Sequence, residues 1–202
     1  MDGIALMATA MNAAKSRLDV SASNLANVST DGFHKSLAHV ALTDRGLVAT
    51  SSLDASQGTL KHTGRTFDLA IVGGGGFFVR EPGGSIVETR SGSFERDASG
   101  HLVDERGRAL AGRNGSPIAA GADASIDARG IVRDAGAVVG QIRLRPGTTV
   151  QSGFLEGANV DAVREMVNVL EAQRAFETAQ KTLGAIDEAR QKDVNDVVRV
   201  KS

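Results

Sequence analysis

Residues 4–25, near the start of the chain, read IALMATAMNAAKSRLDVSASNL. The stretch has no Gly or Pro and is rich in Ala, so it predicts a helix. Its apolar and small residues recur at alternating spacings of three and four. This heptad pattern turns one narrow stripe of a helix toward a partner helix. The stripe consists of Ile4, Met7, Met11, Ala14, Leu18, Ser21 and Leu25.

The other end of the chain predicts a second helix. Asn159 and Asp161 are suited to an N-cap, and apolar residues then recur at helical spacing on both sides of an interruption at Arg174. Valines at 194, 197, 198 and 200 either prolong this helix or lie in a frayed end. Neither helix has an obvious partner within the chain except the other. The apolar positions are Val163, Val167, Leu170, Phe176, Leu183 and Ile186.

Glycine marks out the middle of the chain, because 20 of the 24 glycines lie between Gly58 and Gly157. Such a sequence favours short strands and turns over helices. A faint repeat relates residues 100–107 to residues 130–136 and predicts two similar hairpins. The turn residues separate six predicted strands at 67–72, 77–81, 86–89, 93–97, 101–104 and 108–111.

These patterns predict an α+β protein. The N- and C-terminal helices form a coiled-coil-like helical layer, and the centre is an antiparallel all-β domain. We expect four parts along the chain. They are an N-terminal helix with a following turn at 1–33, a connecting segment at 34–60, the β domain at 61–150 and a C-terminal helix at 151–202.

Composition excludes several classes of protein. The formal net charge is -1 and only 3% of the residues are aromatic, which argues against nucleic acid as a partner. Because the chain has no Cys, it has neither disulfides nor thiolate metal sites. No apolar stretch reaches the roughly 20 residues that a membrane span needs, so direct membrane insertion is not expected. The first apolar stretch also has the wrong flanking charges for a cleaved signal peptide.

No motif in the sequence predicts catalysis, a cofactor or a metal. The glycine run at residues 73–76 lacks the following helix, Lys and Ser or Thr of a phosphate-binding loop, and a tight turn is favoured instead. The four histidines stand at 34, 39, 62 and 101 without metal-ligand spacing, so they are expected to be solvated loop residues. Acidic residues near turns, Asp97, Asp104 and Glu105, are expected to make local hydrogen bonds.

Three blocks of sequence carry a family resemblance. Residues 18–33 read LDVSASNLANVSTDGF, and Asn24 and Asn27 bracket Leu25 in a pattern that resembles the N-terminal signature of bacterial flagellar rod and hook proteins. Residues 153–161, GFLEGANVD, lead into EMVN and EAQRAFE at 165–168 and 171–177, which look like the C-terminal helix of that family. Between them, blocks at 68–79, 89–94 and 139–142 resemble the β domain of the rod proteins.

The resemblance implies a structural subunit of the bacterial flagellar basal-body rod that polymerises through its terminal helices into a drive shaft from motor to hook. Its implied partners are other copies, other rod and hook axial proteins, and the flagellar type III export apparatus. Export without a cleaved signal would take it to the periplasmic rod. The implied assembly residues are Leu18, Asn24, Leu25, Asn27, Gly32, Phe33, Val163, Met166, Val167, Leu170 and Phe176.

The position in the rod and two rival functions stay open at this point. The β block together with the ending at 197–200 favours a proximal rod subunit, and the alternative is a distal one. A rival from another class is a ligand-binding β domain braced by a helix pair, which predicts a well-folded monomer. An enzyme that uses the acidic turns is the weakest rival, because the residues of a catalytic site are not suitably spaced.

Overall fold

In the computed structural model of the chain, the backbone is described for residues 3–200 and the side chains for residues 3–192. The side chains of the valines from 194 onward therefore lie outside the described part. The chain divides into two compact units. The helical unit comprises Met1–Ala26, Lys35–Asp54 and Val160–Ser202, and the β unit comprises Asn27–His34 and Ala55–Asn159.

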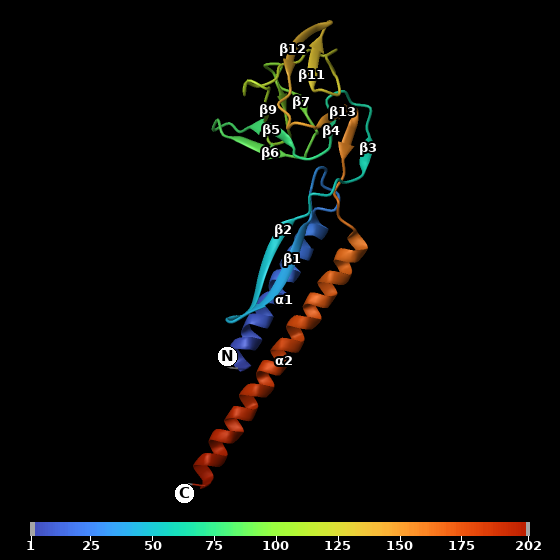
Figure 1. Cartoon of the computed structure of the whole chain (residues 1–202). Coiled ribbons are helices and arrows are strands. Elements are labelled where there is room, and N and C mark those ends of the chain that lie inside the picture. Colours follow the sequence, from blue (N-terminus) through green and yellow to red (C-terminus); the bar gives the residue numbers. More distant parts are fainter. Residues whose placement is uncertain (1–2, 201–202) are drawn as a thin grey trace. The chain divides into compact units, whose positions relative to one another are not determined.

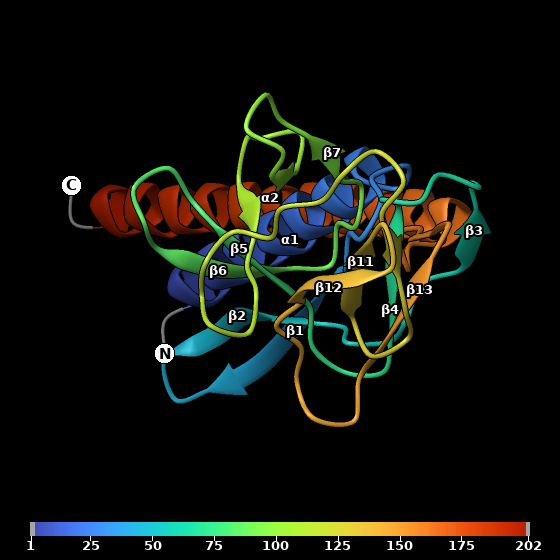
Figure 2. The same ribbon diagram turned by 90° about the horizontal axis from the view of Figure 1, so that it is seen from above.

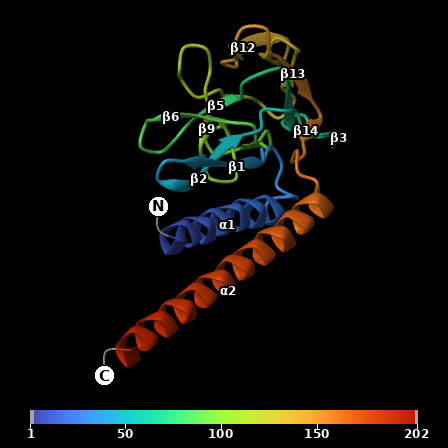
Figure 3. The same cartoon turned by 60° about the horizontal axis from the view of Figure 1, so that its bottom comes forward.

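Two helices form the frame of the helical unit. Helix α1 spans Gly3–Ala26 and helix α2 spans Ala162–Val200, and they lie side by side (Figures 1 and 3). They run antiparallel, since Gly3 lies next to Ile186 and Arg17 Nη2 lies 3.8 Å from Glu171 Oε2. All seven residues of the predicted α1 stripe are buried or half-buried. The N-cap prediction is confirmed, because Asp161 Oδ1 accepts a hydrogen bond from the Arg164 N–H at 3.1 Å.

A β-hairpin completes the helical unit. Strands β1 (Ser36–Thr43) and β2 (Gly46–Leu53) pair antiparallel over their whole length and pack on α1. Gly46 has a positive φ of 106° and lies against Thr9, whose Oγ1 accepts a hydrogen bond from the Leu47 N–H at 3.2 Å. The sequence predicted only a connecting segment at 34–60, so these strands were not expected. They are rich in Ala, Ser and Thr, so they lack a strong alternation of apolar and polar residues.

The β unit consists of short antiparallel strands (Figure 2). The six strands predicted between residues 67 and 111 are all present, in a slightly shorter form. They are β4 (Leu69–Val72), β5 (Phe77–Arg80), β6 (Ile86–Thr89), β7 (Glu95–Arg96), β8 (Leu102–Val103) and β9 (Ala109–Leu110). The other strands are β3 (Leu60–His62), β10 (Ser125–Ile126), β11 (Ile131–Asp134), β12 (Ala137–Gln141), β13 (Thr149–Ser152) and β14 (Phe154–Glu156).

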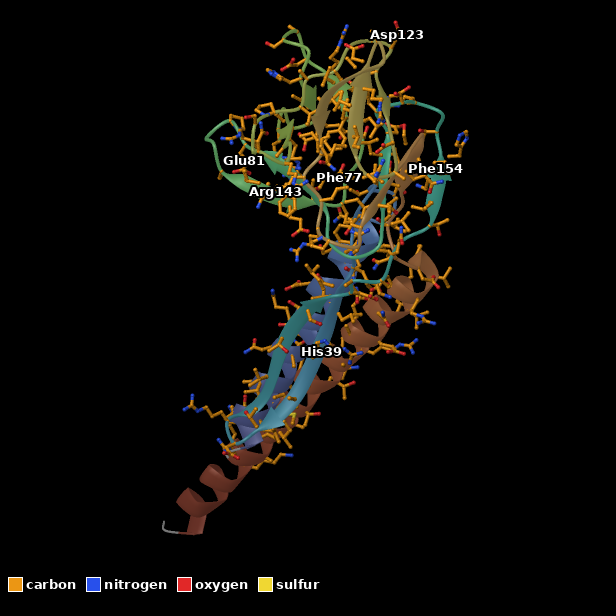
Figure 4. All side chains as sticks on the ribbon, turned by 45° about the horizontal axis from the view of Figure 1, so that its top comes forward. His39, Phe77, Glu81, Asp123, Arg143 and Phe154 are labelled. Carbon is orange, nitrogen blue, oxygen red and sulfur yellow. The ribbon has the colours of Figure 1, made fainter. Side chains whose placement is uncertain are left out.

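The strands combine into four small sheets, three of which contribute residues to one apolar core. Five strands lie in the order β6-β5-β9-β8-β7, three in the order β10-β11-β12, and β13 pairs with β4 as β14 does with β3. The predicted pair of similar hairpins corresponds to β8–β9 and β11–β12. Phe77 and Phe94 meet edge to face in the core, with ring centroids 5.5 Å apart, and Figure 4 shows Phe77 inside the unit.

The acidic turns share one hydrogen-bond pattern. In Asp97-Ala-Ser-Gly100, one carboxylate oxygen of Asp97 accepts the N–H groups of the residues two and four positions later, both at 2.8 Å, and Gly100 has a positive φ. Asp104 and Asp127 repeat the arrangement, with Gly107 and Gly130 at the same place. These N–H bonds lower the pKa of Asp97 and of Asp127. The local hydrogen bonds predicted for acidic turn residues are therefore formed at Asp97 and Asp104.

Candidate functional site

The first half of α2 carries an exposed apolar stripe. Val163, Met166, Val167 and Leu170 follow one another at spacings of three, one and three, which places them on one face of the helix. Their exposed fractions are 72%, 52%, 47% and 54%. Arg174 stands one turn later on the same face and ends the stripe. Such a row of large apolar side chains in contact with water is unusual for an isolated helix pair.

The opposite face of α2 is the one turned toward α1. Glu165, Ala172 and Ala179 recur every seven residues on that face and are buried, and Phe176 lies among them, half-buried. On α1, Leu18 and Leu25 are half-buried members of the heptad stripe. The predicted assembly residues therefore fall into separate groups: Leu18, Leu25 and Phe176 lie on the inner faces of the two helices, whereas the α2 stripe faces outward.

Asn24 holds the hairpin onto α1. Its side-chain N–H group donates to the Ser36 carbonyl at 2.8 Å, and its Oδ1 accepts the Ser36 N–H at 2.9 Å. The amide thus pairs with both backbone groups of the first residue of β1, as a neighbouring strand would. Asn24 is 1% exposed, so these backbone groups have little access to water as an alternative partner.

The predicted turn residues Asn27, Gly32 and Phe33 belong to the β unit. The Asn27 carbonyl accepts the Thr30 N–H at 3.0 Å, which closes the turn after α1, and the Phe33 carbonyl accepts an N–H from Asn159 at 3.3 Å. Gly32 has a φ of 70°, and a Cβ there would lie 2.3 Å from backbone atoms of residues 90 and 91. Only Gly fits this position, because any side chain meets both strain and a collision with backbone.

A buried ion cluster fastens this turn to the rest of the β unit. Glu156 has no exposed side-chain surface, and its Oε2 accepts a hydrogen bond from Arg90 Nη1 at 2.8 Å. Its Oε1 accepts the Gly58 N–H at 2.9 Å and lies 3.2 Å from His34 Nε2. Its carbonyl accepts the Gly32 N–H at 2.6 Å. Four separate segments of the chain therefore meet at one carboxylate.

Sequence reasoning missed this cluster. His34 was expected to be a solvated loop residue, and that is wrong, because its side chain is only 14% exposed and lies against Glu156. A lone Glu inside the apolar stretch Gly153–Gly157 was the signal that could have drawn attention to it. Among the described residues, no group of three or more His, Asp or Glu side chains is arranged to hold a metal ion.

Three family models match the chain in order. Residues 6–34 match the model for flagella basal body rod proteins, residues 70–135 the D1 domain of the flagellar hook protein FlgE/F/G, and residues 151–197 the C-terminal part of the flagellar basal body rod FlgEFG proteins. The matched segments contain the N-terminal block at 18–33, the C-terminal block at 153–177 and most of the β-domain block, whereas its part at 139–142 lies between two matched segments.

Curated relatives agree with these models over nearly the whole chain. The flagellar basal-body rod protein FlgF of Escherichia coli (strain K12) is 31% identical, and the match covers 89% of this chain and 93% of that protein. The rod protein FlgG of Bacillus subtilis (strain 168) is 30% identical, and the match covers 90% of this chain and 93% of that protein. The flagellar hook protein FlgE of Brucella abortus biovar 1 (strain 9-941) is 37% identical, but over only 55% of this chain and 31% of that protein.

The described helices contain no segment that is both long and apolar enough to cross a membrane. The Asn24 hydrogen bonds, the turn at Asn27, Gly32 and Phe33, and the ion cluster at Glu156 each hold separate segments of the chain together. The sequence prediction is thus confirmed: the chain belongs to the family of flagellar basal-body rod proteins and is a structural subunit of the bacterial flagellar rod.

Proposed function

We propose that this subunit polymerises through its terminal helices, and that the α2 stripe formed by Val163, Met166, Val167 and Leu170 packs against helices of neighbouring subunits. The outward position of the stripe carries this proposal. The inner face of α2 already has α1 as its partner, so a second apolar face of the same helix is available to a second molecule.

The stripe is large enough to matter energetically. Burying a fully exposed Val, Leu or Met side chain yields about 1.5–3 kcal/mol, and these four are about half exposed. Complete burial of the stripe would therefore contribute roughly 3–6 kcal/mol at each interface, before the cost of association. Repeated along a helical polymer, such a contact supports a stiff shaft that carries torque from motor to hook around a central export channel.

The inner faces of the helices support a coiled-coil-like layer. The α1 stripe and the buried positions of α2 both follow a seven-residue repeat, which is the spacing that two supercoiled helices require. In this proposal Leu18, Leu25 and Phe176 stiffen each subunit, and the turn at Asn27, Gly32 and Phe33 sets the path of the chain from α1 into the β unit.

The resemblance also supports the remaining parts of the proposal. We place the subunit in the proximal rod, with the distal rod as the alternative position, and its partners are further copies and other rod and hook axial proteins. We further propose that it reaches the periplasmic rod through the flagellar type III export apparatus without cleavage of a signal peptide. This role requires no chemical reaction and no cofactor.

The direct test replaces two residues of the stripe, Met166→Glu with Leu170→Glu, in the full chain. The matched control is Thr182→Glu, because Thr182 is an exposed residue of α2 outside the stripe. Self-association is measured by sedimentation velocity over a range of protein concentrations, and swimming is measured in the source bacterium that carries each variant. We expect the double variant to remain a folded monomer and to abolish swimming, while the control behaves like the unchanged chain.

Two results would contradict the proposal. Assembly and swimming by the Met166→Glu, Leu170→Glu variant would remove the stripe from the interface. An unchanged chain that stays monomeric at every concentration, together with swimming that does not depend on the stripe, would favour the rival of a self-contained β domain braced by a helix pair.

A further inference from the structure

The β unit has a hollow lined by four arginines. Arg113 follows β9, Arg129 lies in the turn before β11, and Arg143 and Arg145 follow β12. The hollow has a volume of about 370 Å³, and Ile142, Leu144 and Pro146 supply apolar parts of its wall. Nothing in the rod function proposed above uses this surface.

Two of the four guanidinium groups are held in place. The Arg143 guanidinium lies over the Phe78 ring, 4.6 Å from its centroid, and Figure 4 shows Arg143 on the β unit. Arg145 forms a forked ion pair with Glu88, with Nε–Oε1 and Nη2–Oε2 distances of 2.9 and 2.5 Å. This pair lowers the pKa of Glu88 and raises that of Arg145. Arginines oriented in advance lose less conformational freedom when they bind an anion.

The glycine run at residues 73–76 makes room for this arrangement. Gly75 has a φ of 91°, and a Cβ there would lie 2.5 Å from Cδ of Arg145. The Gly74 carbonyl accepts a hydrogen bond from the Thr148 hydroxyl at 2.9 Å, and Thr148 lines the same hollow. The run is therefore a turn, as the sequence predicted, and its glycines let the Arg145 side chain lie close to the backbone.

The arginines outnumber their carboxylate partners. Within the described side chains, no carboxylate lies within ion-pair distance of Arg113, Arg129 or Arg143, whereas Arg133 nearby pairs with Asp127 at 3.3 Å. The Asp127 carboxylate is also occupied by the N–H groups of its own turn. The hollow thus carries three guanidinium groups without an ion pair among the described side chains, although Asp127 still attracts Arg129 from beyond ion-pair distance.

We propose that this hollow binds an acidic peptide segment of a neighbouring protein. Carboxylates match the forked geometry of guanidinium groups. A second hollow of about 190 Å³ shares Arg113 and Gln141 with the first and runs beside β12, where Val139 is 47% exposed. The two hollows adjoin at these shared residues and together offer arginines and apolar side chains, which fits a peptide with both acidic and apolar side chains better than a sugar chain covered in hydroxyl groups.

The test uses a fluorescein-labelled decapeptide of alternating Glu and Ala, with fluorescence anisotropy as the readout and the full chain as the binding protein. We expect Arg113→Gln with Arg129→Gln to weaken binding at least tenfold. The matched control is Arg96→Gln with Arg106→Gln, which removes the same charge from two exposed arginines outside both hollows and should change binding less than twofold. Circular dichroism verifies that each variant is folded.

Two further arms sharpen the result. Glu88→Gln removes the carboxylate that pairs with Arg145, so the affinity for the acidic peptide should rise about two- to fivefold. An oligogalacturonate with the same number of carboxylates serves as the sugar probe and should bind more weakly than the peptide.

An equal loss of peptide affinity in the Arg113→Gln, Arg129→Gln variant and in its control would mean that only net charge matters, and this would overturn the proposal. Tighter binding of the oligogalacturonate would overturn the peptide in favour of an anionic polysaccharide. Because the readout is peptide binding and the α2 stripe is unchanged, failure here leaves the proposed assembly through the helices untouched.

Discussion

Replacing Glu156 by Ala should destabilise the β unit by about 3–5 kcal/mol, the range measured when one partner of a buried ion pair is removed. Glu156 has no exposed side-chain surface and Arg90 is only 10% exposed, so the variant leaves a buried guanidinium without its counter-charge. The Gly58 N–H and the His34 ring lose a partner in the same step.

Glu88→Ala is the matched control, because it also removes a Glu from an Arg–Glu pair. Its partner Arg145 is 56% exposed, so water solvates the guanidinium once the carboxylate is gone. Glu88→Ala should therefore leave the free energy of unfolding nearly unchanged. Arg90→Met combined with Glu156→Leu removes both buried charges and should recover a large part of the loss.

Hydrogen exchange in increasing urea is the assay of choice, read by mass spectrometry on peptides from β4 and β5. Those peptides lie within the β unit, so their exchange reports on the opening of that unit. A total stability of about 5–15 kcal/mol is usual for a domain, so the expected loss would lower the urea midpoint markedly. If Glu156→Ala and Glu88→Ala gave equal midpoints, the reasoning from burial would be refuted.

Three further predictions concern backbone geometry and pH. Gly32→Ala should lower the free energy of unfolding by more than about 2 kcal/mol, because φ is positive there and the new Cβ collides with backbone atoms. Gly83→Ala is the control: Gly83 has open space around it, so the free energy of unfolding should change by less than about 0.5 kcal/mol in the same urea assay. Asn24→Ala should cost about 2–3 kcal/mol and speed hydrogen exchange in β1, while Asn12→Ala, an exposed change, should not. The pKa of Asp127 is lowered in the folded protein, so its carboxylate stabilises the fold above the ordinary Asp pKa of about 4, and this stabilisation is lost as pH falls through the folded-state pKa. Asp127→Asn should therefore flatten an acid-unfolding curve followed by circular dichroism. An equally steep acid transition in that variant would count against the turn hydrogen bonds as the cause.

Much of the local structure could be predicted from sequence because it depends on neighbours in the chain. The heptad repeat in residues 4–25 predicted α1, and turn chemistry in the Gly-rich middle predicted six strands at nearly their observed places. The same logic explains Asp97 and Asp104, since each caps its own turn within four residues. These interactions need no distant partner, so a single sequence contains the information.

The hairpin at Ser36–Thr43 and Gly46–Leu53 was missed for the converse reason. Its residues have weak strand patterning, and its position depends on Asn24, twelve residues before Ser36, and on Thr9 of α1. The sequence placed Asn24 in a family signature, but only the structure shows that its amide pairs with the N–H and the carbonyl of Ser36.

The candidate assembly residues of α2 lie on two different faces of the helix. Val163, Val167, Leu170 and Phe176 were predicted as one apolar set, although Phe176 lies thirteen residues after Val163 and therefore about 220° around the helix from it. The packing of α1 made the separation plain, since it buries the side of α2 that contains Phe176 and leaves the other side in water.

Propensity, periodicity and motif spacing are properties of neighbouring residues, so the sequence predicted both helices, the six strands between residues 67 and 111, the turns and the family. The folded structure was needed to show that Glu156 is a buried counter-ion for Arg90, 66 positions away, and that four arginines share one hollow. Burial and charge pairing depend on which distant segments meet in space, and no local pattern in the chain encodes that meeting.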